Sequence, residues 1–85
     1  MRVFLSSSFL KAYKKLPAVV VDLFAFKREI FFKDPFDIQL KTHKLHGTQR
    51  GLYSFSLDRK YRVIFCFDEN ADIVLIKIGK HDIYQ

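Results

Sequence analysis

The chain has little cysteine, proline or glycine. Its 85 residues include one Cys, two Pro and three Gly. The single Cys66 excludes an intrachain disulfide and a zinc site built on paired cysteines, and its apolar surroundings predict a small core residue rather than a nucleophile. No linker, no secretory signal and no apolar run of the ~18 residues that span a membrane is evident. We therefore expect one cytoplasmic domain over residues 1–85.

Aromatic and positively charged residues are abundant instead. Ten Phe and four Tyr contribute to an apolar content of 49%, which can build a dense core in a short chain. The formal net charge is +6, and residues 41–62 alone hold six Lys or Arg against one acidic residue. Such a basic segment favours a polyanion or an acidic protein as partner over an anionic small metabolite.

Helical patterns occupy the first half of the chain. Residues 1–5 are apolar and are expected to form an edge strand, and the serines at 6–8 offer an N-cap for a helix that Pro17 ends. Apolar residues at helical spacing then predict a second helix, with Pro17 in its first turn and a stop at residue 34. Two helices joined so closely predict a hairpin.

Strand patterns occupy the second half. Residues 36–52 are expected to be a loop with local extended structure, and from Tyr53 apolar and polar residues alternate as in a half-buried strand. Apolar strands are expected over residues 61–67 and 72–78, the last ended by Gly79. The order β-α-α-β-β-β predicts an α+β domain in which the helical hairpin packs on a mostly antiparallel sheet.

Arg62 is the one charged residue within the apolar strand at 61–67. An arginine cannot lose its charge, so burying it without an anion is very costly. Either Arg62 pairs with a carboxylate inside the protein, or the face on which it lies is open and receives a phosphate. The strand pattern leaves both alternatives open.

Histidines and tyrosines could complete a site for RNA chemistry. His43 and His46 lie in a basic loop, where most histidines have no function, and His81 follows the last strand. RNA is cleaved without a metal when its 2′-hydroxyl attacks the adjacent phosphate, which requires a base, an acid and a cation; His and Arg supply these. Tyr84 or Tyr61 could stack on an unpaired base. Three histidines fall short of the four ligands of a structural zinc site, so we expect no metal.

Four segments follow one another in the C-terminal half of the chain. They are His43-Lys44-Leu45-x-Gly47, Gly51-Leu52-Tyr53-Ser54-Phe55-Ser56-Leu57, Tyr61-Arg62-Val63-Ile64-Phe65 and Ile78-Gly79-x-His81-Asp82-x-Tyr84. In this order and spacing they resemble the RelE/ParE toxin superfamily, and most closely its RelE and YafQ branches. The helical half fits these toxins in arrangement more than in residues.

The resemblance implies the RelE-like microbial RNase fold and the toxin of a type II toxin–antitoxin pair. Such a toxin cleaves mRNA in the decoding site of the ribosome, uses no cofactor and is silenced by a cognate antitoxin, here expected to be acidic. The match implies that His81 is the general acid, that Arg62 contacts the scissile phosphate, that His43 is the base and that Tyr84 stacks on or positions the RNA.

Two positions depart from the YafQ pattern. Ser56 replaces a histidine and Lys60 replaces an acidic residue, and RelE itself relies on lysines and arginines, so a lysine such as Lys44 is an alternative base. The remaining cations are expected to bind RNA: Lys41, Lys44, Arg50, Arg59 and Lys60. Two other functions stay open, a non-enzymatic ParE-like inhibitor of DNA gyrase and a toxin that has kept its fold but lost its activity.

Overall fold

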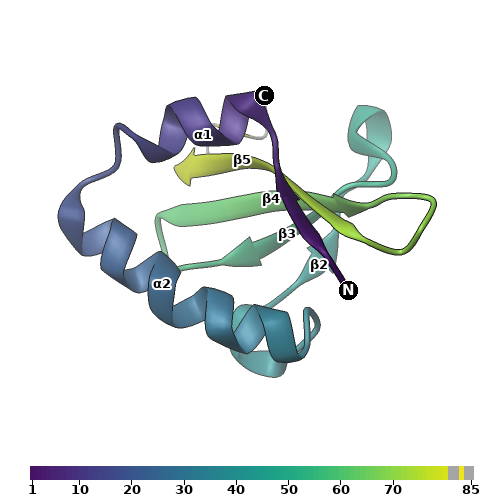
Figure 1. The fold of residues 1–85 in the computed structure, drawn as a ribbon, viewed down its shortest axis with the longest axis horizontal. Coiled ribbons are helices and arrows are strands. Elements are labelled where there is room, and N and C mark those ends of the chain that lie inside the picture. The colour runs from purple at the N-terminus through teal and green to yellow at the C-terminus, as the bar shows by residue number, and fades with distance from the viewer. Residues whose placement is uncertain (81–82, 84–85) are drawn as a thin grey trace.

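Two helices pack on a five-stranded, mostly antiparallel sheet (Figure 1). The computed structural model describes residues 1–80, apart from the side chain of Thr48, together with Ile83. The elements, in order along the chain, are β1 (Val3–Leu5), α1 (Ser7–Tyr13), α2 (Ala18–Lys33), the short 3₁₀ helix η1 (Ile38–Leu40), β2 (His43–Lys44), the 3₁₀ helix η2 (Gly47–Gln49), β3 (Tyr53–Ser56), β4 (Tyr61–Phe67) and β5 (Ile73–Lys80). The predicted α+β class is confirmed.

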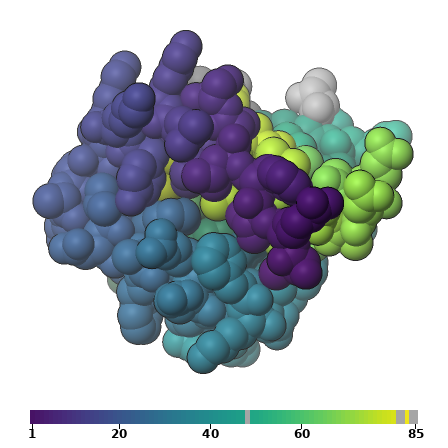
Figure 2. Space-filling view, viewed as in Figure 1, coloured from purple at the N-terminus to yellow at the C-terminus, as the bar shows by residue number. Residues whose placement is uncertain are grey.

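The strands lie in the order β1-β5-β4-β3-β2. β1 is an edge strand, as predicted, and runs parallel to β5, whereas the other neighbours are antiparallel. The helices and β1, purple and blue in Figure 2, cover most of the sheet on the side shown there. The core residues of α1 and α2 pack against one face of the sheet, and the opposite face, on which neither α1 nor α2 lies, is called the helix-free face below.

One core joins both helices to the sheet. Phe31 of α2 stacks on Phe55 of β3 at a centroid distance of 4.6 Å and meets Phe65 of β4 edge-on at 4.9 Å. The predicted alternation along β3 is confirmed, because Phe55 is in the core while Ser54 lies outside it. The buried core residues are Phe9, Val20, Phe24, Phe31, Leu40, Phe55, Leu57, Val63, Phe65, Ile73, Leu75 and Ile78.

Ser6 starts α1, and it also ties the helix to the sheet. Its Oγ accepts a hydrogen bond from the Phe9 N–H at 2.9 Å, as an N-cap does, and donates to the Ile76 carbonyl at 2.7 Å. The prediction that Pro17 ends this helix was wrong, since α1 stops at Tyr13. The backbone N–H groups of Lys15 and Leu16 donate to carbonyls three positions back, so the chain tightens into a turn after the helix.

Gly79 does not end the last strand. β5 continues to Lys80, and Gly79 pairs with Arg62 of β4 within it. A Cβ at Gly79 would approach the Cγ2 of Ile83 to 2.6 Å. The sequence analysis interpreted Gly79 as the end of a strand. In the structure, the missing side chain leaves space for Ile83 and does not change the direction of the chain.

The segment 36–52 contains more structure than the predicted loop. It holds η1, β2 and η2, and β2 pairs antiparallel with β3. Lys41 ends η1 with φ +53° and so has a left-handed backbone conformation. Two residues are too few to show a periodic pattern, which is why β2 escaped prediction as an element.

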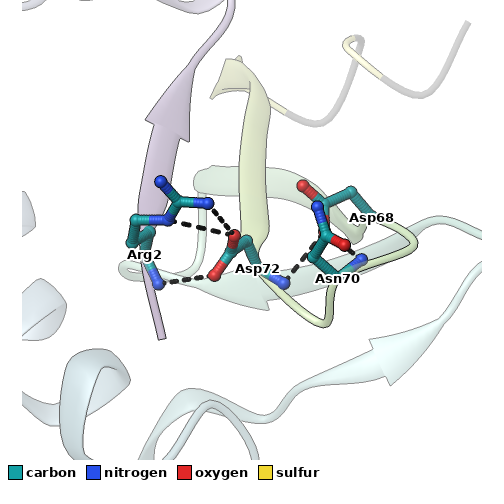
Figure 3. A network of polar contacts seen from close by, with 4 residues as sticks. All are labelled: Arg2, Asp68, Asn70 and Asp72. Carbon is teal, nitrogen blue, oxygen red and sulfur yellow. Dashed lines mark hydrogen bonds and ion pairs between the residues drawn. The ribbon is translucent and has the colours of Figure 1, made fainter.

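A polar network fastens the N-terminus to the turn between β4 and β5 (Figure 3). The Asp72 carboxylate accepts hydrogen bonds from the Arg2 backbone N–H at 2.9 Å and from its guanidinium, with an ion-pair distance of 3.2 Å. Asp68 accepts from the backbone N–H groups of Asn70 at 2.9 Å and of Asp72 at 3.0 Å. The network therefore holds β1 beside β5 at the start of both strands.

This network makes the stability of the fold sensitive to acid. The backbone hydrogen bond from Arg2 is the main cause that holds the pKa of Asp72 below its ordinary value, which burial opposes and the Arg2 charge reinforces. The unfolded chain, with an Asp pKa of about 3.9, then binds the proton more readily than the folded one, so the contribution is complete above about pH 4 and is lost as pH falls through the folded pKa. We expect Asp72→Asn to lower Tm at pH 7 and to reduce its further fall at pH 3.

The control for this prediction is Asp22→Asn, which changes an exposed carboxylate on α2. It is expected to leave the fall in Tm between pH 7 and pH 3 as large as in the unaltered chain. Thermal unfolding followed by circular dichroism at both pH values compares the three proteins. An equal loss of Tm on acidification in all three would contradict the assignment to Asp72.

Candidate functional site

The helix-free face of the sheet carries a row of register neighbours across four strands. His43 of β2 pairs with Ser54 of β3, Ser54 with Ile64 of β4, and Ile64 with Lys77 of β5. Residues directly opposite one another project to the same side of a sheet, so these side chains share one face. Ser54 and Ile64 are fully buried although neither belongs to the helix-side core. The middle of this face is therefore shielded from solvent, and the polar side chains of His43 and Lys77 lie at the two ends of the row.

Arg62 lies in the adjacent row of the same face. It pairs with Ser56 on one side and with Gly79 on the other. Its side chain is half-buried, and its Nη1 donates to the backbone carbonyls of Asp58 and of Tyr61, the latter at 3.2 Å. Among residues 1–80 and 83, no carboxylate forms an ion pair with Arg62. The sequence left two alternatives for Arg62, an internal carboxylate or a bound phosphate. Within the described residues, the first is not found.

His43 is exposed at the opposite edge of this face. Its Nδ1 lies 3.2 Å from the Lys41 carbonyl oxygen. A carbonyl can only accept, so Nδ1 is the donor in this contact, and the neutral tautomer that makes it has the Nε2 lone pair free. From strand spacing and rise, the Cα atoms of His43 and Arg62 are about 12 Å apart. The two side chains thus share a face but do not touch.

The five other predicted cations fall into two groups, and all are exposed. Arg59 and Lys60 lie in the turn between β3 and β4, next to Arg62. The other group surrounds β2 and the loop that follows it: Lys41, Lys44 and Arg50. Lys44 pairs with Tyr53, which packs against the helix-side core, so Lys44 lies on the opposite face from His43.

His81 and Tyr84, predicted as acid and stacking group, lie outside the described residues. The described residues on either side of His81 are Lys80 and Ile83. Lys80 pairs with Tyr61, and the Ile83 side chain approaches the Cα of Gly79 on the Arg62 face. The role of Gly79 in permitting this approach was missed from the sequence, where a glycine at the end of a strand pattern indicates a stop.

Cys66 is half-buried near the end of β4 and does not contribute a reactive thiolate. Burial raises the pKa of the Cys66 thiol above its ordinary value, and the nearby charge of Asp68 raises it further. The thiol is therefore protonated at neutral pH, in keeping with the predicted packing role.

Over residues 1–80 and 83, no three His, Cys, Asp or Glu side chains gather closely enough to share a metal ion. In the same part of the chain, no helix has the length and apolar content needed to cross a membrane.

Solved structures of small toxins share this architecture. YafQ from Escherichia coli superposes with a TM-score of 0.81 at 13% identity, covering 99% of this chain and 98% of its own. A YoeB/ParE toxin from Agrobacterium tumefaciens gives 0.79 at 18% identity over 95% and 99%. The archaeal RelE–RelB complex from Pyrococcus horikoshii gives 0.72 at 28% identity over 93% and 92%. No protein-family model matches the sequence, and a search of the curated proteins finds no match.

The fold is therefore that of the small toxins with two helices on one face of a five-stranded sheet. These structures confirm the resemblance to the RelE/ParE toxin superfamily at the level of the fold, with the RelE of the archaeal complex at 28% identity and YafQ at 13%. The match extends over nearly the whole length of both chains, including the helical half that resembled these toxins only in arrangement.

Proposed function

We propose that this chain is the toxin of a type II toxin–antitoxin pair and cleaves mRNA on the ribosome without a metal ion. The observation that carries the proposal is the environment of Arg62. Its guanidinium is half-buried on the helix-free face, and its described hydrogen bonds go to backbone carbonyls. A carbonyl accepts a hydrogen bond but does not neutralise the charge, so the group is suited to a phosphate, which does both.

His43 is the base in this proposal. The bond between its Nδ1 and the Lys41 carbonyl orients the ring and leaves the Nε2 lone pair available. Lys44, the alternative base, projects to the other face of the sheet. The Cα separation of about 12 Å is comparable to the span of a sugar and its 3′-phosphate, which would contact the two side chains from outside the covered middle of the face.

The reaction then proceeds in one displacement at phosphorus. Nε2 of His43 takes the proton of the 2′-hydroxyl, whose oxygen forms a bond to the adjacent phosphorus. Arg62 donates to the phosphate oxygens as negative charge builds on them. The bond from phosphorus to the 5′-oxygen breaks, and His81 gives that oxygen its proton. The products are a 2′,3′-cyclic phosphate and a 5′-hydroxyl, with Tyr84 positioning or stacking on the RNA.

The exposed cations on either side of this site serve to hold the RNA backbone: Lys41, Lys44, Arg50, Arg59 and Lys60. The same charge favours an acidic antitoxin that covers the site, since a partner rich in carboxylates gains from both attraction and burial. The P. horikoshii neighbour is itself a RelE–RelB complex, which supports a protein partner of this kind.

The proposal is tested by induced expression in bacteria, with the unaltered chain beside His81→Ala. We expect the unaltered chain to arrest growth and to produce message fragments that begin with a 5′-hydroxyl, and the variant to do neither. Equal arrest by both with intact message would contradict the nuclease. A purified gyrase supercoiling reaction distinguishes the rival function, because a ParE-like toxin would block it. If the unaltered chain does not arrest growth, the inactive-toxin alternative holds.

A further inference from the structure

The loop between β2 and β3 encloses a hollow that the proposed reaction does not use. The hollow has a volume of about 420 Å³. Lys44, His46 and Arg50 line it with exposed side chains, beside Leu45, Leu52 and Tyr53, and within the described part of the chain no carboxylate lines it. Three potential hydrogen-bond donors, two of them permanent cations, therefore converge on one concave surface.

The backbone of this loop is closed on itself. The Leu45 N–H donates to the Leu52 carbonyl at 2.9 Å, and the Leu52 N–H donates to the Gln49 carbonyl at 3.1 Å. Gly51 has φ +84°, a left-handed conformation that side chains rarely adopt, and a Cβ there would meet nothing within 4 Å. The glycine at this position thus permits the turn that follows Arg50, one of the residues that line the hollow.

Tyr53 forms an aromatic wall of the hollow. Its ring stacks on Phe65 at 5.5 Å, and Phe67 and Phe36 meet it edge-on at 5.5 and 5.7 Å. The ring is half-buried and held from several sides, so it loses little freedom when a ligand packs against it. An aromatic group next to cations is the usual combination of a single-stranded nucleic-acid site.

We propose that this hollow is a second RNA subsite, in which Lys44, His46 and Arg50 bind a phosphate and Tyr53 packs against the attached nucleoside. The inference rests on the proposed function for the identity of the ligand. Tyr53 pairs with Phe65, three positions along β4 from Arg62, so Tyr53 and Arg62 lie on opposite faces of the sheet, about 10 Å apart along the strand. An RNA strand with its scissile phosphate at Arg62 therefore reaches the hollow by passing around the edge of the sheet at β2.

The shape of the hollow favours a nucleotide over an acidic peptide. Carboxylate side chains on a peptide are attracted by exposed cations alone and need neither a hollow nor an aromatic wall. A nucleotide offers a phosphate to the cations and an apolar base to the ring, and the volume is within the range of small-molecule sites. His46, to which the proposed reaction gives no role, is in this subsite a hydrogen-bond donor to the phosphate.

The test measures binding of a 2′-O-methyl RNA hexamer, which lacks the attacking hydroxyl and stays intact. Fluorescence anisotropy gives its Kd between about 50 and 200 mM salt for the unaltered chain and for Lys44→Ala/Arg50→Ala. Each phosphate neutralised on a single strand contributes about 0.7 to the slope of log K against log salt, and Lys44 and Arg50 bind the same phosphate, so the double variant should lower the slope by about 0.7 and weaken binding roughly 5-fold at 0.1 M. The control Lys11→Ala/Lys15→Ala removes the same charge from the helical side.

A slope that falls equally in both double variants, or in neither, would overturn the subsite. So would a loss of affinity for hexaglutamate with unchanged affinity for the RNA hexamer, since the hollow would then bind a protein partner. The result is separable from the nuclease proposal, because hexamer binding requires no cleavage. If the Lys44→Ala/Arg50→Ala variant alone loses RNA affinity and no message is cut in cells, the subsite is supported and the nuclease proposal is contradicted. If message is cut but the variant binds the hexamer as tightly as the unaltered chain, the nuclease is supported and the subsite is contradicted.

Discussion

Arg62→Ala is expected to lower the rate of RNA cleavage about 10²–10³-fold, the usual cost of removing a donor that stabilises transition-state charge. The guanidinium is the one proposed group that donates directly to the phosphate oxygens as they become more negative. Single-turnover cleavage of a defined RNA at saturating protein measures this effect, because the rate then reports the chemical step and not the affinity. Arg62→Lys should retain part of the activity, since an ammonium keeps the charge but not the planar pair of donors.

The matched control is Arg28→Ala, which removes an exposed guanidinium from α2 on the other side of the molecule. It should cleave at the unaltered rate. Because Arg62 also donates to the Asp58 and Tyr61 carbonyls, the Tm of each variant must be measured beside its rate. A folded Arg62→Ala protein that cleaves as fast as the unaltered chain would remove Arg62 from the reaction.

Phe31→Ala is expected to lower the free energy of unfolding by about 3–5 kcal/mol. Phe31 is fully buried and is the contact through which α2 meets both β3 and β4, by a stacked ring at Phe55 and an edge-on ring at Phe65. Its loss leaves a cavity between layers that cannot collapse without moving the helix. Since small domains are stable by only about 5–15 kcal/mol, much of the folding free energy would be lost.

Phe26→Ala is the control from the same helix, because the Phe26 side chain is 62% exposed. Removing it should change the free energy of unfolding by no more than about 0.5 kcal/mol, as for most surface positions. Urea unfolding of the three proteins provides the comparison, with an unchanged m-value as evidence of the same folded and unfolded states. Similar losses for both variants would mean that α2 is not anchored through Phe31.

Local sequence patterns predicted the features of the fold that depend on neighbouring residues. Phe55 and Ser54 face opposite ways because successive side chains of a strand alternate, and the sequence alone predicts that. The Ser6 cap and the stop after Lys33 also depend on groups within one helical turn. Gly79 was misassigned because its cause is distant: the side chain of Ile83, and not the backbone conformation, requires the missing Cβ.

The candidate site was only partly predictable for the same reason. Resemblance to a toxin family selected Arg62 and His43 as functional residues, but no spacing shows that they share a face. The hollow at Lys44, His46 and Arg50 carried no sequence signal beyond its charge, since its walls come from both ends of a loop that closes through backbone hydrogen bonds.

Residues close together along the chain were enough to predict the order of the two helices and the longer strands, the alternation of core-facing and outward-facing positions in β3, and the concentration of positive charge. The two-residue strand β2 was not predicted. The pairing of β2 with β3 is visible in the folded molecule alone: it brings His43 to the helix-free face with Arg62, while Lys44 lies on the other face. Strand register depends on loop closure and core packing between distant segments, and a shift of one residue would exchange the faces of His43 and Lys44.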